Sequence, residues 1–327
     1  MHHSVATVPM AATAAMLYAR FAASSTRPGL RRLFALTPVL ALLLVLPFLI
    51  QLYSVRGLTA FFLVWLGEFK LLLLAFGHGP LDPRIRPLPF VFTAALPVKL
   101  RQVSEDAAIT KTKTILLSSG IKFAITVALF HHLHYSKERT HPYVAFVLYG
   151  AITYCILDSV LPCLAAMGMA LGMELEPQFN KPYLSASLQD FWGRRWNLMA
   201  SAVLRPSVYI PVRARLGAPA GVLATFLVSG LMHEVVVYYF TFRAPTGQLT
   251  AFFLLHGVCV CAERWCARRC STRPPRVVAT PLVVAFLAGT ACWLFLPAIF
   301  GDGMDDLCLA ETAALASSFR DVSARFF

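Results

Sequence analysis

A histidine and a glutamate interrupt an otherwise apolar stretch of this sequence. Residues 220–240 read AGVLATFLVSGLMHEVVVYYF, and they are long enough to cross a bilayer as one helix. An ionised carboxylate at the centre of a membrane helix costs about 2.5–3.5 kcal/mol on insertion scales. A helix that only anchors the chain would carry leucine at positions 233 and 234. His233 and Glu234 therefore predict a functional site.

The spacing around His233 favours the histidine as the catalytic group. Ser229 precedes it by four residues and so shares its helix face, whereas Glu234 points about 100° away. Neutral imidazole titrates near neutrality and can take a proton from a hydroxyl group. Spacing alone leaves two interpretations open, a general base or a histidine hydrogen-bonded between helices. For Glu234 we predict a structural role, paired with an arginine or a backbone donor of a neighbour.

A second polar element is the pair Trp196 and Asn197. An asparagine amide can donate a hydrogen bond to a developing oxyanion, although helix capping is the commoner role of this residue. Further polar side chains occur in other apolar stretches: Glu68, Lys70, Lys122, Asp158 and His256. We expect the two lysines to extend toward the membrane interface, and the aspartate and the histidine to line the interior of the bundle.

The composition is that of a membrane protein. Of the 327 residues, 58% are hydrophobic and 14% are charged, whereas soluble domains carry about 25% charged residues. Helices that share one bilayer pack as one bundle, so we predict a single domain over residues 1–327. The net charge of +13 does not indicate nucleic-acid binding, because basic and aromatic residues do not interleave on a soluble module.

Cysteine and histidine spacing does not indicate a metal or a disulfide framework. Five of the eight cysteines lie inside apolar runs, where cysteine behaves as a small hydrophobic residue. The group His131, His132 and His134 stands where an apolar segment ends, and interfacial histidines without a metal explain it better. We predict neither a structural metal nor a disulfide scaffold.

Eight apolar segments predict an all-α polytopic protein, a single bundle of about eight transmembrane helices. The segments are 6–23, 35–55, 57–76, 114–130, 143–171, 220–240, 249–262 and 278–300. Most of the 29 lysines and arginines lie in alternate connections, which the positive-inside rule makes cytoplasmic. The opposite side of the membrane then carries both termini and a few basic residues, namely Arg56, Lys137, Arg139 and Arg243. No internal repeat is visible, which argues against an inverted-repeat transporter.

The longest cytoplasmic connection, residues 172–217, is rich in proline, arginine and aromatic residues. Its core, 188–204, reads LQDFWGRRWNLMASAVL and predicts an amphipathic or re-entrant helix at the interface. We predict that Arg194 and Arg195 in this helix meet anionic headgroups or a phosphorylated substrate.

Seven motifs along the chain carry a family resemblance. They are SLQDFWGRRWN (187–197), RPSVYIPV (205–212), ATFLVSGLMHE (224–234), FKLLLLAFGHGPL (69–81), PVKLR (97–101), FFLLHG (252–257) and WLFLP (293–297). Together they resemble the plant wax synthase branch of the membrane-bound O-acyltransferase superfamily. The resemblance covers nearly the whole chain, with a motif-bearing core at about 172–265. The connection 130–142 follows no family motif, and the short first segment predicts a truncated or divergent amino-terminal end.

The resemblance implies a function and assigns residues to it. The family joins a fatty acyl group from acyl-CoA, a co-substrate rather than a cofactor, to the hydroxyl of a lipid alcohol. Its invariant histidine falls on His233 and its asparagine on Asn197, which makes these two the predicted catalytic residues. The predicted supporting residues are Trp196, Ser229 and Glu234, and the predicted substrate-binding residues are Arg194, Arg195 and His256.

The sequence does not decide the acceptor alcohol. A long-chain fatty alcohol, which gives a wax ester, is the first interpretation, and a sterol is the alternative. A lipid or proton-coupled transporter, in which His233 and Glu234 relay protons, is an alternative of a different class. The resemblance implies an integral protein of the endoplasmic reticulum membrane. Acyl chain length and oligomeric state are not decided by the sequence.

Overall fold

Helices make up nearly all of the structure, a computed structural model that describes residues 2–96, 100–101, 105–170, 174–175, 178–269 and 274–326. Two short strands, β1 (Leu100–Arg101) and β2 (Glu174–Leu175), pair antiparallel and are the exception within these ranges. The all-α prediction is confirmed. Most of the 97–101 motif, and the side chains of Cys163 and Cys270, lie outside the described residues.

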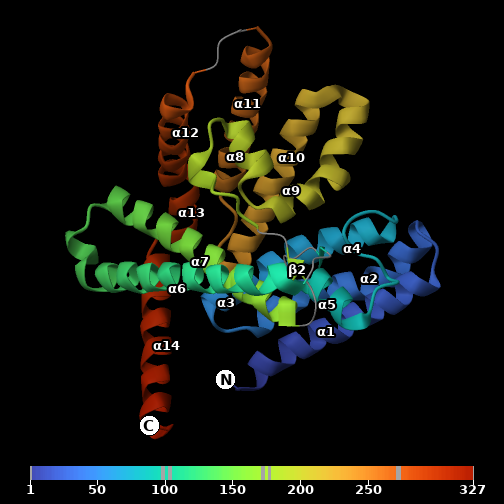
Figure 1. Cartoon of the computed structure of the whole chain (residues 1–327), viewed down its shortest axis with the longest axis horizontal. Helices are drawn as coiled ribbons and strands as arrows, with labels where there is room; N and C mark the ends of the chain where they lie inside the picture. The colour runs from blue at the N-terminus through green and yellow to red at the C-terminus, as the bar shows by residue number, and fades with distance from the viewer. Residues whose placement is uncertain are drawn as a thin grey trace.

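The amino-terminal elements pack against one another and are drawn in blue to cyan in Figure 1. They are α1 (His2–Ser25), α2 (Leu30–Val45), η1 (Leu46–Leu49), α3 (Tyr53–Ala60), η2 (Phe61–Gly67), α4 (Glu68–Ala75) and α5 (Pro87–Ala95). Small alanine side chains line the buried face of α1, so α2 and α5 pack close against it. Met16, Leu36 and Phe90 are fully buried where these three helices meet.

The next two helices form a long antiparallel hairpin, drawn in green across the bundle in Figure 1. They are α6 (Glu105–Ser136) and α7 (Pro142–Ala170), joined through η3 (Lys137–Arg139). Lys122 and Asp158 form an ion pair across the hairpin, with 2.7 Å between Nζ and Oδ2. Each residue therefore supplies the counter-charge that a polar side chain in an apolar segment requires.

The carboxyl-terminal half contains the motif-bearing core. Its elements are η4 (Pro182–Leu184), α8 (Leu188–Arg194), α9 (Leu198–Leu204), η5 (Arg205–Tyr209), α10 (Ile210–Thr241), α11 (Gln248–Arg269), α12 (Arg276–Thr290), η6 (Ala291–Phe295), α13 (Leu296–Phe300) and α14 (Met304–Phe326). The single helix predicted at 188–204 is two helices, because Asn197 adopts a left-handed conformation (φ 42°) between them. Gly217, with φ 85°, divides α10 just before the predicted span begins.

Two buried cations bind the carboxyl ends of helices. The Nζ atom of Lys70, which has no exposed surface, donates to the carbonyls of Thr93 (2.6 Å) and Leu96 (2.5 Å) at the end of α5. The prediction that Lys70 extends to the interface is wrong, because the unpaired carbonyls of a helix end attract a cation. Arg56 likewise donates to the carbonyl of Tyr239 (2.5 Å), close to the end of α10.

A charged cluster fixes the start of α14, which runs away from the rest of the fold in Figure 1. The Nζ atom of Lys137 lies 2.8 Å from a carboxylate oxygen of Asp305 and also pairs with Asp306. Burial lowers the pKa of Lys137, but these two carboxylates outweigh burial and raise the pKa above its ordinary value. Arg243 donates to the carbonyl of Gly301 (3.0 Å) in the same region. Lys137 and Arg243 thus both contact the segment 301–306, and the charge pattern predicts the same side of the membrane for both.

Six helices are long and apolar enough to cross a membrane, among the residues that the structure describes. They are Leu30–Leu49, Tyr53–Ala75, Pro142–Ser159, Leu198–Thr241, Gln248–Arg269 and Arg276–Phe300. The protein is therefore an integral, multi-pass membrane protein, as predicted. The count of eight is not confirmed, since the predicted spans at 6–23 and 114–130 form helices that are not among these six.

Candidate active site

His233 lies in the second half of α10 among aromatic rings from three other segments. Its ring centroid is 4.3 Å from that of Phe253, 4.6 Å from that of Trp65 and 5.8 Å from that of Phe295. Phe253 belongs to α11, Trp65 to η2 and Phe295 to η6. The rings restrict the orientation of the imidazole, which is half-buried and contributes to the wall of a cavity.

The hydrogen bonding of His233 defines its tautomer. Nδ1 lies 2.7 Å from the main-chain oxygen of Ser229. A carbonyl oxygen can only accept, so Nδ1 carries a proton, and in the neutral imidazole Nε2 keeps its lone pair. This is the state that a general base requires. Ser229 was predicted to support the histidine, and the structure shows that its main chain, rather than its hydroxyl group, makes the bond.

Glu234 holds α10 against the amino-terminal end of α11. Its Oε1 accepts a hydrogen bond of 3.1 Å from the main-chain N–H of Thr250, in the first turn of α11. The unpaired N–H groups and the dipole at a helix start stabilise a carboxylate in this position. The side chain is buried, which agrees with the predicted pairing of Glu234 with a backbone donor of a neighbouring helix.

Two glycines let α10 and α11 approach closely around the histidine. A methyl group on Gly230 would lie 2.7 Å from Cα of Thr250, and one on Gly257 would lie 3.0 Å from Cβ of Phe226. Contacts under 3.0 Å do not occur between real side chains, so alanine at position 230 would push the helices apart. The close contact brings Phe253 of α11 onto the ring of His233.

Asn197 stands at the start of α9 and caps it. Its Oδ1 accepts a hydrogen bond of 3.1 Å from the N–H of Ala200, as an N-cap residue does. Its left-handed backbone is one that asparagine tolerates better than most residues. The cap uses the amide oxygen only. Within the described part of the chain, the Nδ2 group of Asn197 has no hydrogen-bond acceptor and stays available as a donor.

His233 and Asn197 line the same cavity, which has a volume of about 270 Å³. Its wall also includes aromatic and small apolar side chains, among them Trp65, Trp192 and Phe253. The cavity lies between α8, α9, α10 and α11, with Trp65 of η2 closing one side. A proton acceptor and an amide donor from distant parts of the sequence therefore face one space. That arrangement suits a reaction in which a hydroxyl group loses a proton while an oxyanion develops.

Three arginines give the cavity a cationic portion: Arg205, Arg213 and Arg264. Arg264 is oriented by Gln189, whose Oε1 accepts from its Nε at 3.2 Å, and the guanidinium group of Arg213 lies over the ring of Tyr209. All three arginines belong to connections that the charge pattern assigns to the cytoplasm. Sequence reasoning missed them as binding residues, although the 205–212 motif includes the first of them.

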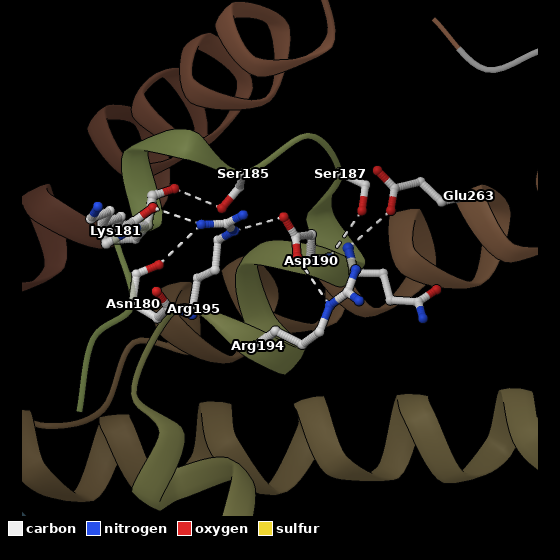
Figure 2. Close-up of polar contacts among 10 residues, drawn as sticks. Asn180, Lys181, Ser185, Ser187, Asp190, Arg194, Arg195 and Glu263 are labelled. Atoms are coloured by element: carbon white, nitrogen blue, oxygen red, sulfur yellow. Dashed lines mark hydrogen bonds and ion pairs between the residues drawn. The ribbon is translucent and has the colours of Figure 1, made fainter. Parts of the chain in front are cut away.

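Arg194 and Arg195, which were predicted to meet anionic headgroups or a phosphorylated substrate, do not line this cavity. Figure 2 shows both arginines directed at Asp190, with Nε atoms 3.0 Å and 2.7 Å from its carboxylate oxygens. Arg195 also donates to the main-chain oxygens of Asn180 (3.2 Å) and Lys181 (3.3 Å). Arg195 therefore holds the preceding loop against α8, while the side chain of Arg194 is 75% exposed.

The same network sets the position of α8. Ser187 caps the helix by accepting from the N–H of Asp190 (2.9 Å), and Glu263 of α11 accepts from the N–H groups of Leu188 (2.8 Å) and Gln189 (3.0 Å) (Figure 2). Burial raises the pKa of Asp190, but the hydrogen bond and charge of Arg195 outweigh it and lower the pKa below its usual range. Asp190 therefore stays ionised.

His256 does not reach the cavity either, although it was predicted to bind substrate. It is fully buried, and both ring nitrogens have protein partners. The indole Nε1 of Trp192 donates to its Nδ1 at 3.1 Å, and its Nε2 lies 2.9 Å from Oγ1 of Thr290. His256 therefore influences the cavity through Trp192, which does line it. Trp196 lines the cavity as well, stacked on Phe191.

A cavity that holds His233 and Asn197 among the helices of a multi-pass membrane protein is an arrangement that suits a membrane-bound enzyme. The sequence pattern of the membrane bound O-acyl transferase family matches residues 175–255, which contain both Asn197 and His233.

Curated relatives match along most of the chain. Probable long-chain-alcohol O-fatty-acyltransferase 1 of Arabidopsis thaliana is 37% identical over 92% of each chain. The long-chain-alcohol O-fatty-acyltransferase of Simmondsia chinensis is 39% identical over 90% of this chain and 89% of its own. Acyl-CoA--sterol O-acyltransferase 1 of Arabidopsis thaliana is 36% identical over 92% of each chain. The chain belongs to the membrane bound O-acyl transferase family, and it is an acyltransferase of the branch that contains these plant enzymes. This membership excludes the transporter considered from the sequence.

Proposed function

We propose that this acyltransferase transfers a fatty acyl group from acyl-CoA to the hydroxyl of a long-chain alcohol and so makes a wax ester. The observation that carries the proposal is the cavity that holds both the unprotonated Nε2 of His233 and the amide of Asn197. Relatives named for long-chain alcohols, 37% and 39% identical over most of the chain, support this acceptor. The endoplasmic reticulum membrane, where lipid alcohols dissolve, is the proposed location.

The proposed reaction is a direct transfer without an acyl-enzyme intermediate. Nε2 of His233 accepts the proton of the alcohol as its oxygen attacks the thioester carbonyl. The carbonyl oxygen becomes negatively charged, and the Nδ2 group of Asn197 donates a hydrogen bond to it. When the tetrahedral intermediate collapses, the C–S bond breaks and His233 returns the proton to the sulfur of coenzyme A. The proposed reaction requires no resident cofactor.

The arginine-lined portion of the cavity suits the phosphates of acyl-CoA. Arginine pairs with phosphate through two parallel hydrogen bonds, which is why it is common in phosphate sites. Arg205, Arg213 and Arg264 lie on the side assigned to the cytoplasm, from which acyl-CoA arrives. The alcohol is soluble in the bilayer and enters between the helices. The acyl chain and the hydroxyl group thus approach His233 from different directions.

Ester formation from defined substrates tests the proposal. Microsomes from a host that makes no wax ester would express the full chain and receive labelled palmitoyl-CoA with hexadecanol, with a sterol or with both. A labelled ester of hexadecanol as the main product is expected. A sterol ester as the main product would favour the alternative acceptor, which the sterol acyltransferase relative at 36% identity brings into consideration. No new ester from either alcohol would refute the function.

Substituting Arg264 with glutamine is expected to raise KM for palmitoyl-CoA with little change in kcat. The loss of one partly exposed ionic hydrogen bond corresponds to about a three- to tenfold effect. The effect should diminish at high salt, because salt screens exposed charges. Arg194→Gln is the matched control, since Arg194 is exposed and pairs with Asp190 outside the cavity. An equal rise in KM for both variants would contradict the assignment of Arg264.

A further inference from the structure

Trp192 lines the cavity and also packs into an apolar cluster that includes Phe226 of α10, Phe253 of α11 and Phe286 of α12. One part of its side chain lines the cavity, and its ring packs on Phe226, Phe253 and Phe252 at centroid distances of 5.7, 5.4 and 6.3 Å. Phe253 also contacts the ring of His233, at 4.3 Å. Trp192 and His233 thus line the same cavity and share Phe253 as a neighbour.

A buried hydrogen-bond chain holds the indole of Trp192 in place. Trp192 Nε1 can only donate, so Nδ1 of His256, at 3.1 Å, must accept. Nε2 of His256 therefore carries the ring proton and donates to Oγ1 of Thr290 at 2.9 Å. The hydroxyl of Thr290 in turn donates to the carbonyl of Phe286 at 2.8 Å. The donor and the acceptor of each of these hydrogen bonds are therefore fixed.

These hydrogen bonds connect three separate helices, α8, α11 and α12. His256 has no exposed surface and Thr290 is 8% exposed, so water does not replace a broken bond. Rotation of the indole would leave buried polar groups unpaired, which is strongly unfavourable. Trp192 is accordingly a rigid wall of the cavity, whereas a phenylalanine at this position would lack the polar anchor.

We propose that Trp192, positioned by His256 and Thr290, selects the acceptor alcohol by narrowing the cavity beside His233. The inference rests on the proposed function. The cavity, at about 270 Å³, falls just below the usual range of about 300–1,000 Å³ for small-molecule pockets. A primary alcohol presents one carbon chain next to its hydroxyl group, whereas a sterol presents two ring carbons. A rigid indole wall in the cavity that holds the base therefore favours straight-chain alcohols over the bulkier sterols.

A competition assay with Trp192→Leu tests this inference. Microsomes would receive labelled palmitoyl-CoA with equal amounts of hexadecanol and a sterol, and the ratio of the two esters would be measured. Leucine keeps an apolar wall but removes the indole, so the ratio of sterol ester to wax ester should rise about 10- to 100-fold, the discrimination typical of small volume changes in an apolar pocket. Trp265→Leu is the matched control, because Trp265 on α11 is 57% exposed and lies outside the cavity.

A milder variant separates selectivity from folding. Thr290→Val keeps the volume of the side chain but removes the acceptor for Nε2 of His256. The ring proton of His256 can then occupy either nitrogen, and a proton on Nδ1 would break the hydrogen bond from Trp192. We expect a smaller shift of the ester ratio in the same direction, and Thr290→Ser, which restores a hydroxyl group, should return the ratio to the wild-type value. A purely structural hydrogen bond would change the amount of protein without changing the ratio of products.

Three outcomes would contradict the proposed role of Trp192. An unchanged ester ratio in Thr290→Val, together with an unchanged ratio in any active Trp192→Leu protein, would overturn it. An equal shift in Trp265→Leu would also overturn it. A wild-type chain that makes no ester from either alcohol would refute the proposed function and this inference together, whereas an unaltered ratio with active enzyme refutes the inference alone.

Discussion

Substitution of His233 with glutamine is expected to lower ester synthesis by about 10²- to 10⁴-fold, the usual contribution of a general base. Glutamine retains an N–H group that can donate to the carbonyl of Ser229, but its amide does not take a proton from a hydroxyl at neutral pH. Both side chains are of similar size, so the contacts with Trp65 and Phe253 persist in part. The measurement is the initial rate of labelled ester formation, normalised to the amount of protein in the membrane.

Ser229→Ala is the informative control for this prediction. The bond that orients His233 comes from the main-chain oxygen of Ser229, at 2.7 Å from Nδ1, and alanine supplies the same oxygen. The Ser229→Ala variant should therefore keep most of its activity. A loss as large as that of His233→Gln would give the hydroxyl a direct role, and a fully active His233→Gln variant would refute general-base catalysis by this histidine.

The helices in the membrane could be predicted well because burial in lipid selects apolar residues. The predicted span 278–300 corresponds to Arg276–Phe300, and 57–76 corresponds to Tyr53–Ala75. The predicted ends of the helices are less accurate where a helix continues beyond the membrane into water. The segment 249–262 belongs to a helix that runs from Gln248 to Arg269, since charged residues extend the helix beyond the apolar part. Hydropathy therefore predicts which residues lie in the membrane, but not the residue at which a helix ends.

The break between α8 and α9 could not be predicted from periodicity. Residues 188–204 keep an apolar face on both sides of Asn197, so the pattern favours one continuous helix. The break depends on a single left-handed residue and on the loop that Arg195 ties to the end of α8. Such a contact joins residues about fifteen positions apart in sequence, and a hydropathy pattern carries no information about it.

The polar residues show the same limit, because the type of a side chain does not identify its partner. His256 and Arg195 were predicted to bind substrate, yet protein groups bind both of them. Arg213 and Arg264 looked like ordinary cytoplasmic charges, yet they line the cavity. Residue type and position already indicated His233 and Asn197, and the family motifs made them the predicted catalytic residues. The structure brings the two into one cavity although 36 residues separate them.

Asn197 combines two functions that a single substitution can separate. Its Oδ1 caps α9, at 3.1 Å from the N–H of Ala200, and its Nδ2 remains available to a substrate oxygen. Aspartate also caps helices well and tolerates the left-handed conformation at this position. It has no amide donor, and its charge opposes a developing oxyanion. Asn197→Asp therefore preserves the structural function and removes the catalytic one.

The expected result for Asn197→Asp is a fall in kcat of about 10²- to 10³-fold, as for the loss of one oxyanion donor. The amount of protein and its resistance to thermal inactivation should stay close to the wild-type values, because the cap persists. Asn197→Ala provides the comparison, since alanine supplies neither the cap nor the donor and disfavours φ 42°, and it should lose both activity and stability. An Asn197→Asp enzyme with wild-type kcat would reduce Asn197 to a helix cap, and the negative charge in the tetrahedral intermediate would then require another donor from the cavity wall.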